Sequence, residues 1–83
     1  MLQSARTAKQ IGAIIRRARR SAGMSQATLG AKIGLRQATI SKLERGEPAT
    51  QLVTLLDVLS ALGMEIIIDR RGRVVARDLE DIF

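Results

Sequence analysis

Apolar residues recur every three or four positions along the first three quarters of the chain, which is the period of amphipathic helices. Thr7 and Gln10 fit a capping box, in which the Thr7 hydroxyl caps the helix and the Gln10 side chain reaches back. Gly23 is well placed to end this helix. The pattern therefore predicts a helix from the capping box to about Ala22, with an apolar stripe of Ile11, Ile14, Ile15, Ala18 and Ala22.

A second, shorter helix is predicted after Ser25, whose hydroxyl can accept a hydrogen bond from a free backbone N–H in the first turn. Leu29 and Ile33 lie on one face of it, four residues apart. Gly34 follows where the chain needs a residue that tolerates positive φ. A tight turn therefore joins this helix to the next one.

The third helix is predicted from about Gln37 to Arg45, with Ile40 and Leu43 turned to the core. Gly46 ends it, and Pro48 prevents an easy restart. Its other face is polar or basic and holds no acid, and such a face can enter a major groove, where Arg and Gln pair with guanine and adenine edges. We expect base reading by Arg36, Gln37, Ala38, Ser41 and Lys42, with Thr39 near a phosphate.

The fourth helix is predicted from Thr50, as N-cap, to about Leu62, before Gly63. It is too apolar for a helix with one solvent-exposed face, so we expect it to complete the core and to contribute to a dimer interface. A short leucine zipper is disfavoured, because a coiled coil needs three or four heptads. The apolar positions are Leu52, Val53, Leu55, Leu56, Val58, Leu59 and Leu62.

After Gly63 the pattern changes to β-branched residues, which predicts a strand over residues 64–69, a turn, and a second strand over 73–77. A lone two-stranded hairpin is marginal in water, and its open edge invites another chain. We therefore expect this element to dimerise the protein. The predicted dimer contacts are Leu59, Leu62, Met64, Ile66, Ile67 and Ile68.

The chain has 83 residues and a net charge of +6, and the charge is unevenly distributed. Residues 1–47 carry ten Lys and Arg against two acids, whereas residues 48–83 carry four Arg against six acids. Positive charge is thus concentrated in the part of the chain that contains the two short helices, which is typical of a DNA-binding protein. Arg16 and Arg20 are interpreted as a solvated face, and Arg17 as an additional contact to the DNA backbone.

The composition excludes several functions. The chain has no His and no Cys, so thiolate catalysis, imidazole acid–base chemistry and the usual zinc sites are ruled out. No P-loop or dinucleotide fingerprint is present, and we expect neither an enzyme nor a cofactor. No run is apolar enough to span a membrane and no signal peptide is recognisable, which predicts a cytoplasmic protein, held at the nucleoid by DNA.

The segment from Ser25 to Gly46 carries the pattern S-Q-x-x-L-x-x-x-I-G-x-x-Q-x-x-I-S-x-x-E-x-G, which resembles the helix-turn-helix of phage-repressor and Xre-type regulators. The stretch GLRQATISKLERG, a Leu-rich helix and a β-like tail are most similar to HipB-type antitoxins. The resemblance implies a mainly α fold: a lambda-repressor-like DNA-binding domain of four to five helices with a short C-terminal β-strand or hairpin. Gly30, usually Ala in the family, and Arg36, a poor N-cap, depart from the pattern.

The resemblance also implies roles for individual residues. Arg19 would form a structural ion pair with Glu44, gripping the carboxylate with both arms of its guanidinium. Gln26 would donate a hydrogen bond to a phosphate, and Arg45 would lie against the sugar–phosphate backbone. In a HipB-like protein the homodimer would bind double-stranded operator DNA, and its partner would be a HipA-like toxin kinase.

We divide the chain into a DNA-binding domain at 1–63, a dimerisation element at 64–77 and an acidic tail at 78–83. The tail is either inert or a docking segment with Leu79, Ile82 and Phe83 as apolar anchors. Three functions remain open: a repressor that is also the antitoxin of a HipBA-type pair, a free-standing Xre-type repressor (or antitoxin of another toxin class), and a protein-interaction module whose basic face is idle.

Overall fold

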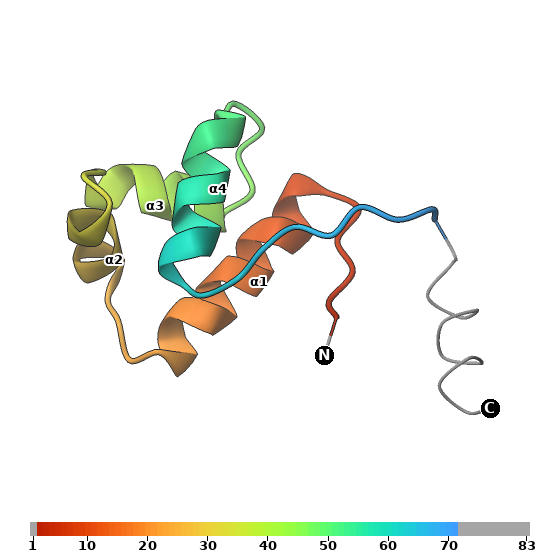
Figure 1. The fold of residues 1–83 in the computed structure, drawn as a ribbon. Helices are drawn as coiled ribbons and strands as arrows, with labels where there is room; N and C mark the ends of the chain where they lie inside the picture. The colour runs from red at the N-terminus through yellow and green to blue at the C-terminus, as the bar shows by residue number, and fades with distance from the viewer. Residues whose placement is uncertain (1, 72–83) are drawn as a thin grey trace.

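Four helices make up the fold in a computed structural model that describes residues 2–71 (Figure 1). They are α1 (Ala8–Ser21), α2 (Gln26–Lys32), α3 (Gln37–Glu44) and α4 (Leu52–Ala61). α3 packs against both α1 and α2, and α4 packs on α2. The mainly helical fold predicted from the sequence is thereby confirmed.

Side chains cap the first two helices. The Thr7 hydroxyl accepts from the Gln10 backbone N–H at 3.1 Å, as predicted, but the Gln10 side chain accepts from the backbone N–H of Arg6, not of Thr7. The Ser25 hydroxyl accepts from the Thr28 N–H at 3.0 Å. These bonds satisfy N–H groups that have no partner within the helix, so they fix where α1 and α2 begin.

The last two helices begin without a side-chain cap, at Arg36 and Gln51. The prediction of Thr50 as the N-cap of α4 was therefore wrong by one residue. The Thr50 hydroxyl instead donates to the Glu47 carbonyl at 3.5 Å, within the preceding turn.

The core lies where the four helices meet. Ile15, Leu29, Ile40 and Val58, one from each helix, are fully buried. Leu43 and Leu59 join them, and Ile11, Met24, Ile33, Leu35 and Leu55 are among the residues packed around this centre. Ala22, predicted on the apolar stripe of α1, is exposed because it is the C-cap residue, where the chain turns away.

Gly46 holds the end of α3 against the start of α1. Its φ is +78°, a conformation that favours glycine, and a Cβ at this position would lie 2.5 Å from the Lys9 Cα. A side chain here would push the two helices apart. The C-terminal end of α3 is therefore held close to the N-terminal half of α1.

Beyond α4 the chain turns at Gly63 and continues as an irregular trace, which crosses α1 in the view of Figure 1 before it runs past the helices. No strand forms between residues 64 and 71, so the predicted first strand is not seen within a single chain. The predicted second strand, 73–77, and the tail, 78–83, lie outside the described residues. In the part of the chain that is described, no helix is long and apolar enough to cross a membrane.

Candidate nucleic-acid interface

The outer face of α3 is the part of the molecule best suited to meet a nucleic acid. Ile40 and Leu43 face the core, and this orientation turns the polar side of the helix outward. Most of the residues predicted to read bases lie on the open side. Arg36, Gln37, Ala38 and Lys42 are exposed, and Thr39 and Ser41 are half-buried.

Two cations on this face are free to meet a ligand. Arg36 stands at the N-cap without using its side chain to cap the helix. Neither Arg36 nor Lys42 forms an ion pair with any residue between 2 and 71. A guanidinium and an ammonium without a protein partner favour an anionic or acceptor-rich surface opposite them.

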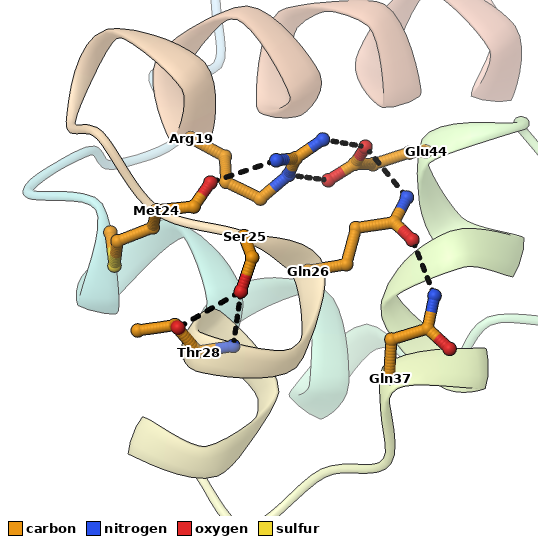
Figure 2. Close-up of polar contacts among 7 residues, drawn as sticks. All are labelled: Arg19, Met24, Ser25, Gln26, Thr28, Gln37 and Glu44. Carbon is orange, nitrogen blue, oxygen red and sulfur yellow. Dashed lines mark hydrogen bonds and ion pairs between the residues drawn. The ribbon is translucent and has the colours of Figure 1, made fainter.

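Behind this face, Arg19 and Glu44 form a two-armed ion pair between α1 and the end of α3 (Figure 2). Arg19 Nε donates to Glu44 Oε2 at 2.6 Å, and Nη2 donates to Oε1 at 2.9 Å. The third arm, Nη1, donates to the Met24 carbonyl at 2.8 Å, in the link to α2. The two side chains are only 9% and 3% exposed. The ion pair that the resemblance implies is present, and it ties three segments together.

The surroundings of this pair keep both groups charged. Burial by itself raises the pKa of Glu44, but the hydrogen bonds from Arg19 and Gln26 and the charges of Arg19 and Arg16 outweigh it, so the pKa is lowered. The hydrogen bond to Glu44 raises the pKa of Arg19 against the opposing effect of burial. The pair therefore stays ionised near neutral pH.

Gln26 links the ion pair to the outer face of α3, as Figure 2 shows. Its Nε2 donates to Glu44 Oε1 at 3.1 Å, and its Oε1 accepts from Gln37 Nε2 at 2.6 Å. A continuous chain of hydrogen bonds therefore runs from buried Arg19 to exposed Gln37. The contact between Gln26 and Gln37 is not predictable from the sequence, because nothing in an eleven-residue spacing across a turn signals it.

Arg45 sits just beyond the C-terminal end of α3. Its Nη1 donates to the Ser41 hydroxyl at 3.1 Å, and its Nη2 pairs with Glu47 at 3.2 Å in an exposed ion pair. Exposed pairs of this kind contribute little energy, so Arg45 can turn to another anion at small cost. Arg45 and Ser41 are thus neighbours at one end of the outer face of α3, which is called the reading face below.

The predicted dimer contacts divide into two groups. Leu59 is only 6% exposed and packs in the core of its own chain, so it leaves little surface for a second chain. Leu62 and Met64 also pack against the core, in part. Ile66, Ile67 and Ile68 are 44%, 55% and 92% exposed.

The outer side of α4 adds apolar surface that nothing covers within residues 2–71. Leu52, Val53 and Leu56 are exposed there, although the sequence places all of them on the apolar part of the helix. The predicted anchors of the tail, Leu79, Ile82 and Phe83, lie outside the described residues.

These features suit the interface to a polyanion with hydrogen-bonding edges. It combines free cations, amides and hydroxyls on a helix face without acids, and the buried pair and Gln26 hold the geometry of this face from behind. Among residues 2–71 there is no group of acidic side chains that could hold a metal ion.

Comparison with known proteins gives three kinds of match. A family model described as helix-turn-helix matches residues 15–67. A curated relative is 44% identical over 54 residues: the uncharacterized HTH-type transcriptional regulator y4dL of Sinorhizobium fredii (strain NBRC 101917 / NGR234). The match covers 65% of this chain but only 28% of that relative's length.

Solved structures of HipB are similar over most of the chain. A complex of a HipB variant with an O2 20mer is 29% identical, with a TM-score of 0.80 over 87% of this chain and 100% of the matched chain. The HipB–O4 20mer complex and the HipA–HipB–O2–O3 complex are each 28% identical, with a TM-score of 0.79 over 86% of this chain and 100% of the matched chain.

Proposed function

Because this chain belongs to the helix-turn-helix family, and its matched relatives are DNA-binding regulators and not enzymes, we propose that it is a dimeric, sequence-specific repressor. The observation that carries the proposal is the outer face of α3, which is exposed, basic and free of acids. A helix of this kind fits the width of the major groove of B-DNA, where every base pair presents a distinct pattern of donors and acceptors.

Gln37 is the residue best prepared to read a base. One hydrogen of its Nε2 is donated to Gln26. The second hydrogen and Oε1 remain for a ligand, because an amide has two donor hydrogens and an acceptor oxygen. That combination matches adenine, whose N7 accepts and whose N6 donates in the major groove. Gln26 would hold the amide in this orientation before DNA arrives, so less rotamer freedom is lost on binding.

Arg36 and Lys42 would read guanine or contact phosphates at the two ends of the same face, with Ser41 and Ala38 between them. The phosphate contacts we propose come from Gln26, Thr39 and Arg45. Nε2 of Gln26 gives one hydrogen to Glu44 and keeps one for a phosphate oxygen. Such contacts set the position and register of α3 without reading sequence.

Dimerisation would place two copies of α3 on one face of the duplex. The exposed apolar residues of α4 and of residues 66–68 supply the surface for it. We propose that residues 64–69 pair with the same residues of a second copy, since an unpaired β-branched edge is stabilised by another strand. Two reading helices about 34 Å apart would then meet successive major grooves of a palindromic operator.

We further propose that the repressor is the antitoxin of a HipBA-type system, repressing its own operon and neutralising a HipA-like toxin kinase. The support is the likeness to HipB over most of the chain, including HipB in a complex with HipA. Leu79, Ile82 and Phe83 of the tail would dock on that partner.

A selection experiment tests the DNA-binding part. The purified chain is incubated with a library of random duplexes at low salt, and bound duplexes are amplified and sequenced. We expect a palindromic consensus from the parent protein. Gln37→Ala should lose preference at one position of each half-site, at a cost of about 1–3 kcal/mol. A parent protein that enriches no sequence would refute the repressor and leave a protein-interaction module.

Co-expression tests the antitoxin part. The gene beside this one, which by this proposal encodes a HipA-like kinase, is expressed with the full chain, or with a chain in which Phe83 is changed to Ala, and growth is measured. We expect the full chain to restore growth and the Phe83→Ala chain to restore less. A full chain that selects a DNA consensus yet restores no growth would identify a free-standing repressor.

A further inference from the structure

A groove beside the reading face carries more positive charge than base reading requires. It is open to solvent and is lined along α1 by Lys9, Arg16, Arg17 and Arg20, and at the end of α3 by Arg45. We propose that this groove binds the phosphodiester backbone of the duplex outside the base pairs that α3 meets. The proposal rests on the proposed DNA-binding function and extends it to a second, sequence-independent site.

The spacing of the α1 residues makes one continuous stripe. Lys9, Arg16 and Arg20 follow one another at intervals of seven and four residues, which bring side chains to the same side of a helix. Ala13 lies between them, and its short side chain leaves the floor of the groove open. At a rise of ~1.5 Å per residue the stripe is roughly 16 Å long. A duplex carries one charge per ~1.7 Å of its axis, so several phosphates fit along it.

The charge of the stripe is uncompensated within the described part of the chain. Lys9, Arg16 and Arg20 are exposed and form no ion pair with any residue from 2 to 71. The one acid that lines the groove, Glu44, is already neutralised by Arg19. Arg17 makes only a hydrogen bond to Gln3, at 3.2 Å. A purely solvated face would not need four cations along a single helix side.

Continuity with α3 identifies the occupant. Arg45 lines the groove and also donates to Ser41 on the reading face, so the two surfaces meet at the C-terminal end of α3. Gly46 holds this end of α3 against Lys9 at the start of the stripe. A DNA backbone that passes Arg45 at the edge of the major groove would therefore continue along α1.

The test compares two variants with the same loss of charge. Arg16→Gln with Arg20→Gln empties the groove of two cations and retains the length of the side chains. Arg6→Gln with Lys32→Gln removes two exposed cations that do not line it. Affinity is measured by fluorescence anisotropy from about 50 to 200 mM salt. The probes are the selected duplex and the same duplex extended by ~10 base pairs, one helical turn, at each end.

We expect the extension to raise the affinity of the parent and of the control variant, but not of the groove variant. Each lost phosphate contact reduces the slope of log affinity against log salt by ~0.9. The two substitutions remove four contacts from a dimer, so the affinity of the groove variant should be on the order of a hundredfold less sensitive to a fourfold rise in salt. All three proteins should prefer the selected sequence over a scrambled one by the same ratio, since backbone contacts carry no sequence information.

Equal salt slopes for the groove variant and the control would overturn the inference while leaving sequence selection by the parent intact. A groove variant that binds more tightly than the parent would also overturn it, and would point to the acidic residues of the tail as the occupant. If the parent selects no sequence, the proposed function fails, and the same slopes measured on mixed-sequence duplexes still test the groove.

Discussion

Removal of Arg19 should destabilise the protein far more than removal of Arg20, one residue away. Arg19 makes two hydrogen bonds to Glu44 and one to the Met24 carbonyl, and its side chain is 9% exposed. Arg20 is exposed and has no ion-pair partner in residues 2–71. The change Arg19→Ala would leave the Glu44 carboxylate buried, with only Gln26 still donating to it.

Loss of one partner of a buried ion pair costs about 3–5 kcal/mol, because the other charge stays in a poorly solvated place. A domain of this size shifts its melting temperature by about 4–8 °C per kcal/mol, so we expect a decrease of at least ~12 °C for Arg19→Ala. Arg20→Ala should stay within about 0.5 kcal/mol of the parent. Thermal unfolding followed by circular dichroism measures both.

Total stability of a chain this long is about 4–12 kcal/mol, at ~0.05–0.15 kcal/mol per residue, so Arg19→Ala risks being unfolded. A double variant, Arg19→Met with Glu44→Leu, removes both charges and should recover most of the loss. Equal melting temperatures for Arg19→Ala and Arg20→Ala, or a double variant less stable than Arg19→Ala, would refute the view that the pair clamps α1 to α3.

Three further predictions follow from particular contacts. Because the pKa of Glu44 is lowered in the folded state, Glu44 should stabilise the fold fully above its ordinary pKa of 4.5, and this stabilisation should be lost as pH falls through the lowered pKa. The urea midpoint of Glu44→Gln should therefore depend less on pH across this range than that of the parent, and parallel profiles would contradict this. Gly12→Ala should destabilise the fold by about 1–3 kcal/mol despite the better helix propensity of Ala, because the new Cβ would lie 2.6 Å from the Leu43 carbonyl oxygen. An unchanged melting temperature would contradict this and show that α3 can move away. Ile67→Asp, at a residue 55% exposed in the single chain, should retain the helical circular dichroism signal but sediment as a monomer, and a variant that still sediments as a dimer would move the interface elsewhere.

The boundaries of the helices were predictable because local chemistry sets them. Thr7 and Ser25 cap helices with their own hydroxyls, and positive-φ glycines stand just past the ends, as Gly23 and Gly34 do. These signals need only neighbouring residues. The start of α4 was placed one residue early because no side chain caps it, so the sequence carries no local mark there.

Contacts between residues that are distant in the sequence were harder to predict. The pair of Arg19 and Glu44 spans 25 positions, and only the family resemblance connected them. The hydrogen bond between Gln26 and Gln37 depends on how α2 and α3 pack, which no periodicity encodes.

For helix α4 the sequence could not predict which apolar side chains are buried. This helix is apolar on more than one side, so the pattern could not tell that Leu59 faces the core while Leu52 faces outward.

The central claim is that the outer face of α3 meets the bases of a DNA duplex. Backbone amide chemical shifts, measured as the selected duplex is titrated into isotope-labelled protein, test it directly. We expect the largest changes at residues 36–42 and at Gln26, with the Gln37 side-chain amide among the most affected signals. Changes confined to α4 and residues 64–71, with α3 unmoved, would contradict the claim.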